Sequence, residues 1–413
     1  MWFILLREFF QDLRKQKLRT SLTLVAITWG TIAVVTLLAF GEGLTNRMMQ
    51  GMMGGGNQVI IFFGGQTSRS YEGLDVGRRI RFSEEDVDLI RQTVPYIELI
   101  SPQYHRGVSL RSEHTSTNTH MEAVNPSFEE MRTMYPVAGG RFLNERDLAE
   151  HRRVVFLGNQ IAEQLFPDGD AVGSQIEIDR TPYTVVGVMH EKLQMAMSYG
   201  PDSRRAVIPY TTFRQVYSHR YLNSILIRPS DPAHQEAVIE GVREVMARKY
   251  RFDRTDHQAI GVWDFVEAMK IQERVFLGIK IFLFAIGFFT LLIAGVGVAN
   301  IMYVVVKERT REIGVKKAIG ARNRQIVSQF IFEALFICLM GGAAGLLISI
   351  GIVQGVLSLG LEGGAADFLG SPELSVDAMI MTTGVLTMIG LLAGIFPARR
   401  AALVDPVESL RYE

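Results

Sequence analysis

The sequence predicts an α-helical membrane protein with four transmembrane helices and a large α+β extracytoplasmic domain, in two subdomains, between the first and second helices. Three observations predict this fold class: four long apolar runs, basic residues on one side of those runs, and strand patterns in the segment between the first two. The chain has 413 residues, of which 48% are hydrophobic, and 43 basic residues balance 43 acidic ones. This neutral balance argues against a nucleic-acid-binding protein, which usually has a basic excess.

Four runs carry no charged residue over a length that can cross a bilayer. A helix rises about 1.5 Å per residue, so roughly 20 apolar residues span the hydrocarbon core. The alternative, a soluble protein with four buried helices, fits poorly because soluble helices of this length usually keep a polar face. The uncharged runs are residues 20–41, 281–306, 334–361 and 378–398.

Residues 1–19 predict an amphipathic helix in the cytoplasmic interface, because apolar side chains recur at helical spacing among basic ones. The alternative is that they form the frayed start of the first transmembrane helix. A basic start before an apolar run also resembles a secretory signal peptide, but "LLAFGEG" at the end of the run lacks a clear cleavage pattern. We therefore expect an uncleaved transmembrane helix over residues 20–42.

Basic residues cluster before the first run, between the second and third runs, and after the fourth, whereas residues 362–376 contain no Lys or Arg. By the positive-inside rule, both termini, the segment 307–325 and the tail 399–413 are cytoplasmic. Residues 362–376 then form a short external loop, and residues 43–262 lie outside. The other transmembrane helices are expected at 263–306, 326–361 and 377–398.

Residues 43–262 predict the α+β extracytoplasmic domain. Strands are predicted by "NQVIIFF", "SQIEID", "TPYTVVGVM" and "NSILIRP", which are rich in β-branched and aromatic residues. Helices are predicted by "SEEDVDLIRQTV", where Ser83 and Asp86 form a capping-box pattern, and by "DPAHQEAVIEGVREVMARKY". Residues 160–190 are expected to form one subdomain. The Met- and Gly-rich residues 48–65 predict a flexible linker, the alternative being an adaptable apolar surface.

Residues 263–276 predict a stalk. Apolar side chains recur near helical spacing and run directly into the second apolar run, with no Pro or Gly before Gly278. A continuous helix here would stand out of the membrane and transmit motion to the outer domain. The alternative is that these residues only pack onto that domain.

No motif for catalysis is present in the sequence. It contains no G-x-x-x-x-G-K-[ST] loop, no G-x-S-x-G, no H-E-x-x-H and no C-x-x-C. The single cysteine, Cys338, excludes an intrachain disulfide. His114 and His120 lie in a polar stretch that is more typical of a solvated strand or loop than of a metal site. We expect no catalytic residue, metal or cofactor on this chain.

Polar groups inside transmembrane helices are costly and often functional. We expect the amide of Asn300 to bond a neighbouring helix, and Glu333, near the cytoplasmic face, to reach water or pair with an Arg. Small residues four apart allow close helix approach. Two such pairs occur, Gly341 with Gly345 and Gly390 with Gly394.

The segment 307–325 predicts a short amphipathic cytoplasmic helix. Glu312 and Lys316 have the favourable i,i+4 order, and Gly320 can cap the helix end. A charged loop alone would not need an apolar stripe. The predicted stripe is Val315, Ala318, Ile319, Arg322 and Ile326.

This segment and its neighbours, "GVGVANIMYVVVKERTREIGVKKAIGARNRQIVSQFIFEALFICLMGGAAGLL", closely resemble the core of the MacB/FtsX-type permeases of ABC transporters. The close of the chain, "FPARRAALVDPVESLRYE", and the outer stretch "GRFLNERDLAEHRRVVFLGNQIAEQLFPDGDAVGSQIEIDRTPYTVVGVMHE" resemble the same family. The resemblance covers most of the chain and is weak only over residues 50–120.

The resemblance implies a coupling helix that docks into a separate ABC ATPase subunit, which binds ATP and Mg²⁺. It also implies a second permease copy, as a homodimer or heterodimer, with a periplasmic adaptor and outer-membrane exit duct as further partners. Because only 19 residues precede the first run, we expect the ATPase on another polypeptide. The motif positions are Glu308, Arg311, Glu312, Gly314, Lys316, Ala318, Gly320 and Ala321.

The function implied is that of a permease in a bacterial inner membrane that transmits ATP-driven motion to its outer domain for export of a peptide, antibiotic or lipid-linked molecule. Two alternatives stay open: activation of an external partner such as a cell-wall hydrolase, and extraction of lipoproteins. The sequence leaves the substrate and the identity of the partner subunits undetermined.

Overall fold

The computed structural model describes residues 17–56, 58–169, 171–194, 200–359 and 370–403. The chain divides into two compact units. We call Met1–Arg47 with Arg274–Glu413 the membrane unit, and Met48–Glu273 the outer unit. Most of the predicted interfacial helix, much of the predicted external loop and the end of the predicted tail lie outside the described residues.

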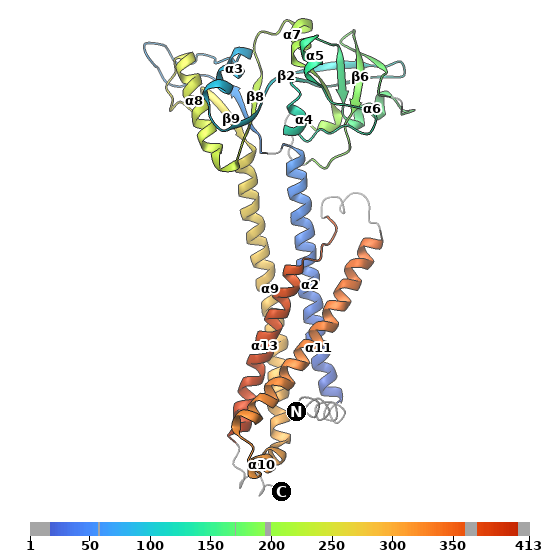
Figure 1. Ribbon diagram of the computed structural model, residues 1–413, viewed down its shortest axis with the longest axis vertical. Coiled ribbons are helices and arrows are strands. Elements are labelled where there is room, and N and C mark those ends of the chain that lie inside the picture. The colour runs from blue at the N-terminus through green and yellow to red at the C-terminus, as the bar shows by residue number, and fades with distance from the viewer. Residues whose placement is uncertain (1–16, 57, 170, 195–199, 360–369, 404–413) are drawn as a thin grey trace. The chain divides into compact units, whose positions relative to one another are not determined.

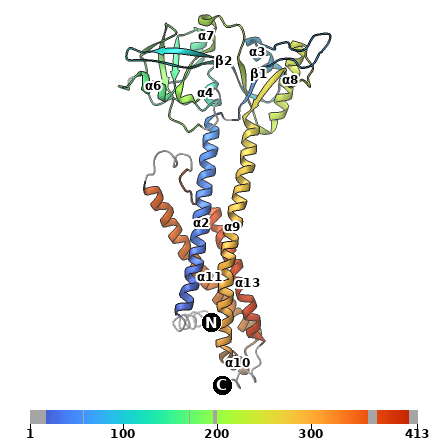
Figure 2. The same cartoon turned by 180° about the vertical axis from the view of Figure 1, so that it is seen from behind.

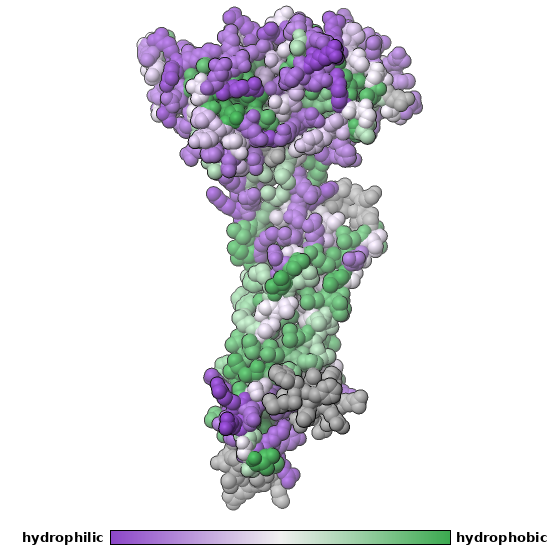
Figure 3. All heavy atoms as spheres, in the orientation of Figure 1, coloured by the Kyte–Doolittle hydropathy of each residue, from purple (hydrophilic) through white to green (hydrophobic). Residues whose placement is uncertain are grey.

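The described part of the membrane unit contains four helices that are long and apolar enough to cross a bilayer. On the face drawn in Figure 3, hydrophobic residues cover the middle of these helices. The helices are α2 (Lys17–Gly54), α9 (Phe265–Glu308), α11 (Asn323–Ser358) and α13 (Val376–Ala402).

Glycines bring these helices into close contact, as the small-residue pairs predict. A Cβ added at Gly341 would lie 2.9 Å from the side chain of Ile27 on α2. A Cβ added at Gly394 would lie 3.0 Å from Ala334 on α11. Both distances are shorter than ordinary contact, so α11 packs against α2, and α13 against α11, through backbone that only glycine leaves open.

The outer unit contains an open antiparallel sheet with strand order β2-β8-β1-β9. Apolar residues of these strands occupy mainly buried positions, as expected for strands that pack at least one face against a core. Their bounds are β1 Ile60–Gly64, β2 Ile97–Arg111, β8 Ser224–Pro229 and β9 Ile260–Asp264. Strand β9 is the free edge of this sheet among the described strands.

A second group of described strands closes on itself in the order β2-β3-β7-β4-β6-β5, with β5 pairing back to β2. We call this ring the barrel. Strand β2 belongs to both parts: Ile97–Gln103 faces β8, and Tyr104–Arg111 faces β3. Figures 1 and 2 show β2 passing between the two parts. The other strands are β3 Ser116–Val124, β4 Val154–Leu157, β5 Gln175–Ile178, β6 Thr181–Val188 and β7 Arg205–Pro209.

Helices α3 (Glu84–Thr93) and α8 (Gln235–Tyr250) belong to the open-sheet part. The predicted capping box at the start of α3 is present: the Ser83 N–H donates to the Asp86 carboxylate at 2.6 Å. Short helices accompany the barrel strands: α4 Phe128–Met131, α5 Glu145–Ala149, α6 Asn159–Leu165 and α7 Tyr210–Tyr217. Two 3₁₀ turns are Asp202–Arg204 and Pro232–His234.

One apolar cluster combines residues of the open sheet and the barrel. Ile61 and Leu226 come from the sheet, and Phe156 and Val207 from the barrel. Phe265, the first residue of α9, is buried in the same cluster. Since interiors pack at near-crystalline density, the two parts have little room to slide past each other without repacking this cluster.

The structure corrects three predictions. The prediction of a flexible linker at residues 48–65 is wrong, because α2 continues to Gly54 and β1 begins at Ile60. The barrel is much larger than the predicted subdomain 160–190, since its strands range from β2 to β7 and pair over long sequence separations. The predicted stalk begins at Phe265, because residues 260–264 form β9 instead.

From Phe265 the helix α9 is continuous for 44 residues. At 1.5 Å per residue its length is about 66 Å, more than twice the roughly 30 Å of a hydrocarbon core. Asp264 caps its start, accepting hydrogen bonds from the N–H groups of Val266 and Glu267 at 2.9 and 3.1 Å. The predicted continuous stalk helix is thus present.

Candidate functional site

The predicted cytoplasmic helix is α10, Thr310–Ala318, between the end of α9 and the start of α11. Its C-terminal end is a Schellman motif. The N–H of Ala321 donates to the Lys316 carbonyl at 2.9 Å, and that of Gly320 to the Lys317 carbonyl at 3.0 Å. Gly320 has φ +98°, a conformation that suits glycine. Gly320 therefore ends α10 as predicted.

Apolar contacts anchor α10 to the larger helices. Ile313 is 4% exposed and packs in one cluster with Val306 of α9 and Ile326 and Phe330 of α11. Lys317 adds a polar contact, its Nζ donating to the carbonyl of Ala402 at the end of α13 at 2.8 Å. The position of α10 is thus fixed by residues of three helices.

A largely buried ion pair lies beside this anchor. Arg309, just before α10, places Nη1 3.2 and 3.3 Å from the two carboxylate oxygens of Glu333 on α11. Glu333 is 6% exposed and also accepts from Gln329 at 3.2 Å. Lys316 of α10 donates to the same Gln329 at 3.3 Å. Glu333 thus has the arginine partner that the sequence suggested.

The other motif positions divide between an exposed and a buried side. Gly314 is buried, and Lys316 and Ala321 are half-buried. The exposed motif residues are Glu308, Arg311, Glu312, Ala318 and Gly320. On the drawn face, hydrophilic residues gather at this end of the helices (Figure 3).

The predicted apolar stripe does not lie on one helix. α10 ends at Ala318, so Arg322 and Ile326 do not continue its surface. Ile313 and Gly314 are buried instead, whereas Val315 is 45% and Ile319 81% exposed. The exposed side of α10 therefore combines charged and apolar groups, a composition that suits docking to another protein.

Asn300 does not bond another described helix of this chain, and its bond to a neighbouring helix stays a prediction. Its side chain is exposed, and no hydrogen bond joins its amide to another of the residues described here. The buried residues of this part of α9 are Val298 and Met302. Each lies two residues from Asn300, about 200° around the helix, so Asn300 faces away from the other helices.

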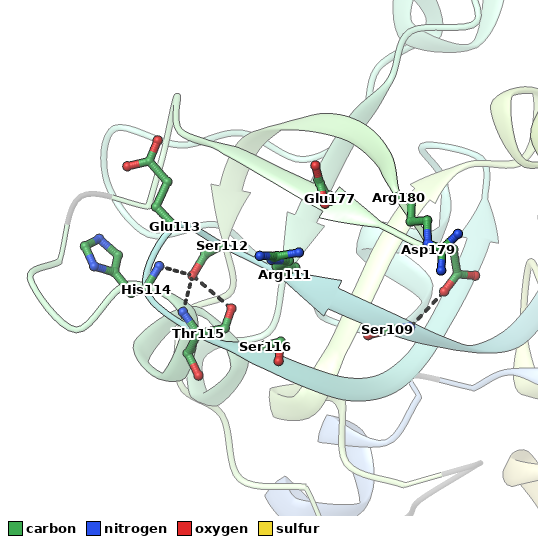
Figure 4. Close-up of a pocket in the computed structure, with 10 residues that line it drawn as sticks. All are labelled: Ser109, Arg111, Ser112, Glu113, His114, Thr115, Ser116, Glu177, Asp179 and Arg180. Carbon is green, nitrogen blue, oxygen red and sulfur yellow. Dashed lines mark hydrogen bonds between the residues drawn. The ribbon is translucent and has the colours of Figure 1, made fainter.

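The outer unit carries a wide polar cleft of about 810 Å³ at the turn between β2 and β3 and the turn between β5 and β6 (Figure 4). The Ser112 hydroxyl accepts from the N–H groups of His114 and Thr115, and Asp179 accepts from Ser109 N–H at 2.9 Å. These bonds fix the two turns. Within the described residues no group of His, Cys, Asp or Glu could hold a metal ion.

Sequence reasoning missed a buried charge cluster in the outer unit. It consists of Glu122, Arg132, Lys192, Asp202 and Arg205. Burial alone would raise the pKa of Asp202, but the charges of Arg132, Lys192 and Arg205 outweigh it and lower that pKa to about 2. No sequence signal marks this cluster, because its members are spread over more than 80 residues.

Two family models match the chain. Residues 20–245 match the MacB-like periplasmic core domain, and residues 284–406 match the FtsX-like permease C-terminal. The chain belongs to the MacB/FtsX family of ABC transporter permeases. Its four candidate spans and its MacB-like periplasmic core domain point to an inner-membrane protein. Neither matched family model is an ATP-binding domain.

Curated relatives of this permease share about 30% of its residues. It is 29% identical over 412 residues to the macrolide export ATP-binding/permease protein MacB of Bdellovibrio bacteriovorus, covering 99% of this chain and 61% of that protein. It is 31% identical over 409 residues to the protein of the same name from Rhodospirillum rubrum, covering 98% and 59%. The chain thus spans about three fifths of the length of these relatives.

Two solved structures are similar to about half of the permease. The periplasmic region of MacB from Actinobacillus actinomycetemcomitans gives a TM-score of 0.43 at 16% identity, covering 54% of this chain and 95% of that one. The extracellular domain of the noncanonic ABC-type transporter YknZ from Gram-positive bacteria gives 0.42 at 14% identity, covering 50% and 100%.

Proposed function

We propose that this permease couples ATP hydrolysis on a separate ATPase subunit to movements of its outer unit, and thereby exports a substrate. The observation that carries the proposal is α10. This short, capped helix is anchored by Ile313 and lies beside the Arg309–Glu333 ion pair, and it exposes both charged and apolar side chains. ATP and Mg²⁺ would bind the ATPase subunit.

The proposal includes an orientation. Basic residues occur on α10, at Arg311, Lys316 and Lys317, and in the last turn of α13, at Arg399 and Arg400. By the positive-inside rule these ends lie in the cytoplasm, where the ATPase is. The outer unit then faces the periplasm.

Export is the activity that the relatives' names support, since both name macrolide export. We extend to this chain only the class of activity, with a peptide, an antibiotic or a lipid-linked molecule as substrate. A second permease copy, a periplasmic adaptor and an outer-membrane exit duct complete the proposed assembly. Motion would reach the outer unit through the long helices α2 and α9.

The coupling role of α10 is tested by charge reversal. We expect Glu312→Lys to leave the protein inserted and folded, because Glu312 is exposed, while reducing ATPase binding and export at least tenfold. The matched control is Glu163→Lys, an exposed glutamate on α6 of the outer unit. Equal ATPase binding and export in both variants would exclude α10 as the docking helix.

Affinity purification from native membranes tests the partners. An ATPase recovered together with a periplasmic adaptor would support export. An ATPase recovered with a wall hydrolase or with lipoproteins would replace export by activation or extraction. Recovery of the chain without any ATPase would contradict the proposal.

A further inference from the structure

The outer end of α2 contacts the barrel directly. At Gly54, the last residue of α2, an added Cβ would lie 1.9 Å from the carbonyl oxygen of Leu193. The backbones of the two segments therefore touch, with no side chain between them. Leu193 belongs to the segment that follows β6 of the barrel.

Polar contacts hold the segment around Leu193 in place. Lys192 Nζ lies 2.7 Å from the Asp202 carboxylate and donates to the Arg132 carbonyl at 2.5 Å. On the other side of Leu193, the side-chain oxygen of Gln194 accepts from the Asp202 N–H at 2.7 Å. The residue that touches α2 thus lies between two residues bound to Asp202.

Asp202 is in turn fixed to the barrel. Its carboxylate lies 2.8 Å from Arg132 and 3.4 Å from Arg205, the first residue of β7. Arg205 also pairs with Glu122 of β3. Of these four residues none is more than 2% exposed. Moving Asp202 would therefore strand buried charges, which is strongly unfavourable.

Helix α9 is attached to a different part of the outer unit. Lys270 of α9 donates to Gln235 of α8 at 2.8 Å, and Gln235 also bonds Asp264, the residue that caps α9. These contacts belong to the open sheet. The start of α9 also bonds the segment that follows α2, because the Phe265 N–H donates to the Val59 carbonyl at 3.1 Å.

We propose that Lys192, Asp202 and Arg132 form a latch that makes the barrel follow α2, while the open sheet follows α9. The proposal rests on the proposed function only in assuming that α2 moves. Because the backbones touch at Gly54, a displacement of α2 pushes directly on Leu193. The latch holds the segment around Leu193 against the barrel, so the barrel moves with it. A shift of α2 relative to α9 then turns the barrel against the open sheet about β2, and this turn repacks the apolar cluster that the two parts share.

Lys192→Met is the variant of choice. It removes one cation and leaves Asp202 and Glu122 balanced by Arg132 and Arg205, so the barrel should stay folded. Lys192→Arg keeps the charge and serves as the conservative control. Gly54→Ala forces a Cβ into Leu193 and should release the latch from the other side.

Distances are measured by paired spin labels on the full chain in lipid nanodiscs, with Cys338→Ser as background. Labels at Gln50→Cys on α2 and Glu163→Cys on α6 report α2 against the barrel. Labels at Gln50→Cys and Glu236→Cys on α8 report α2 against the open sheet. All three labelled positions are exposed.

We expect Lys192→Met and Gly54→Ala to broaden the Gln50–Glu163 distribution at least twofold, with the Gln50–Glu236 distribution and the Lys192→Arg variant unchanged. A Gln50–Glu163 distribution of unaltered width in Lys192→Met would overturn the latch. Equal broadening of both label pairs would also overturn it, because the effect would then be general loosening.

The test separates the latch from the proposed function, because the label distances require no ATPase. In the assembled complex, Lys192→Met should keep ATPase binding and lose export at least fivefold. Absence of any ATPase partner for the unmodified chain would remove the proposed function and leave the distance result standing.

Discussion

The buried charge cluster of the outer unit and the charged residues of α10 use the same residue types in opposite surroundings. Asp202 is fully buried and contacts three cations. Glu312 and Arg311 are exposed on a helix whose backbone is fixed by other residues. Burial therefore separates charges that hold the fold from charges that are free to meet a partner surface.

Replacing Asp202 should have the largest effect on stability. Asp202→Ala leaves the buried Arg132 and Arg205 and the half-buried Lys192 facing a single carboxylate, that of Glu122. Breaking a buried ion pair in this way costs about 3–5 kcal/mol. Thermal unfolding of the full chain in detergent, followed by circular dichroism, measures the loss. The control is Glu150→Ala, an exposed glutamate paired with Arg146, which should give no measurable change. An equal loss of thermal stability in both variants would contradict the distinction between buried and exposed charges.

The pH dependence of stability sharpens the same comparison. Because Arg132, Lys192 and Arg205 depress the pKa of Asp202 to about 2 in the folded state, its stabilisation is present above the unfolded pKa of about 3.9. It is lost as the pH falls from about 4 through 2, and amounts to about 2 kcal/mol. Unfolding measured from pH 7 to pH 2 should show this loss in the unmodified chain. In the milder variant Asp202→Asn the loss should be smaller.

Much of the fold was predictable because its signals are local. The four spans follow from uncharged runs, and the strands β1, β5, β6 and β8 from β-branched residues between turn formers. The barrel was not predictable, since it closes only when β2 pairs with β5 and β3 pairs with β7, and both partners lie far along the chain. Residues 48–54 were also mispredicted, because their glycine content favours a linker whereas they form the end of α2. In the fold this helix end is in backbone contact with Leu193 through Gly54, a tertiary contact that the local sequence does not reveal.

The candidate site divides in the same way. Gly320 was predictable as a cap because a cap is a local pattern, and Glu333 because an acid in a span needs a partner. The side of α10 that is buried was not predictable. It depends on where α11 and α13 place their apolar residues. In the fold these residues bury Ile313 and leave Val315 and Ile319 exposed.

The Arg309–Glu333 pair lies between the two extremes and should give an intermediate effect. In Glu333→Ala, Arg309 loses a carboxylate at 3.2 Å, but its side chain is 16% exposed and can still reach water. We expect a loss of about 2 kcal/mol, below that of a fully buried pair. Thermal unfolding in detergent measures it, with Arg324→Ala on the first turn of α11 as the exposed control. A larger loss than for Asp202→Ala would contradict the ranking by burial.

Gly320→Ala should have the smallest effect and leave the charges of α10 untouched. A Cβ at φ +98° strains the Schellman motif and costs about 1 kcal/mol. Hydrogen exchange of the Ala321 and Gly320 amides should become faster while the rest of the unit is unchanged. Gly297→Ala on α9, where an added Cβ meets nothing within 4 Å, is the matched control.

The chain enters and leaves the barrel at one place. Asn223, just before β8, donates its N–H to Gln103 and accepts from the N–H of His105, so exit and entry are hydrogen-bonded neighbours on β2. Everything between them is one uninterrupted insertion into a sheet that already joins both long helices through β1 and β9. The barrel is therefore a single insertion into the open sheet, and side-chain packing in the shared apolar cluster attaches it further to the sheet that holds the helices.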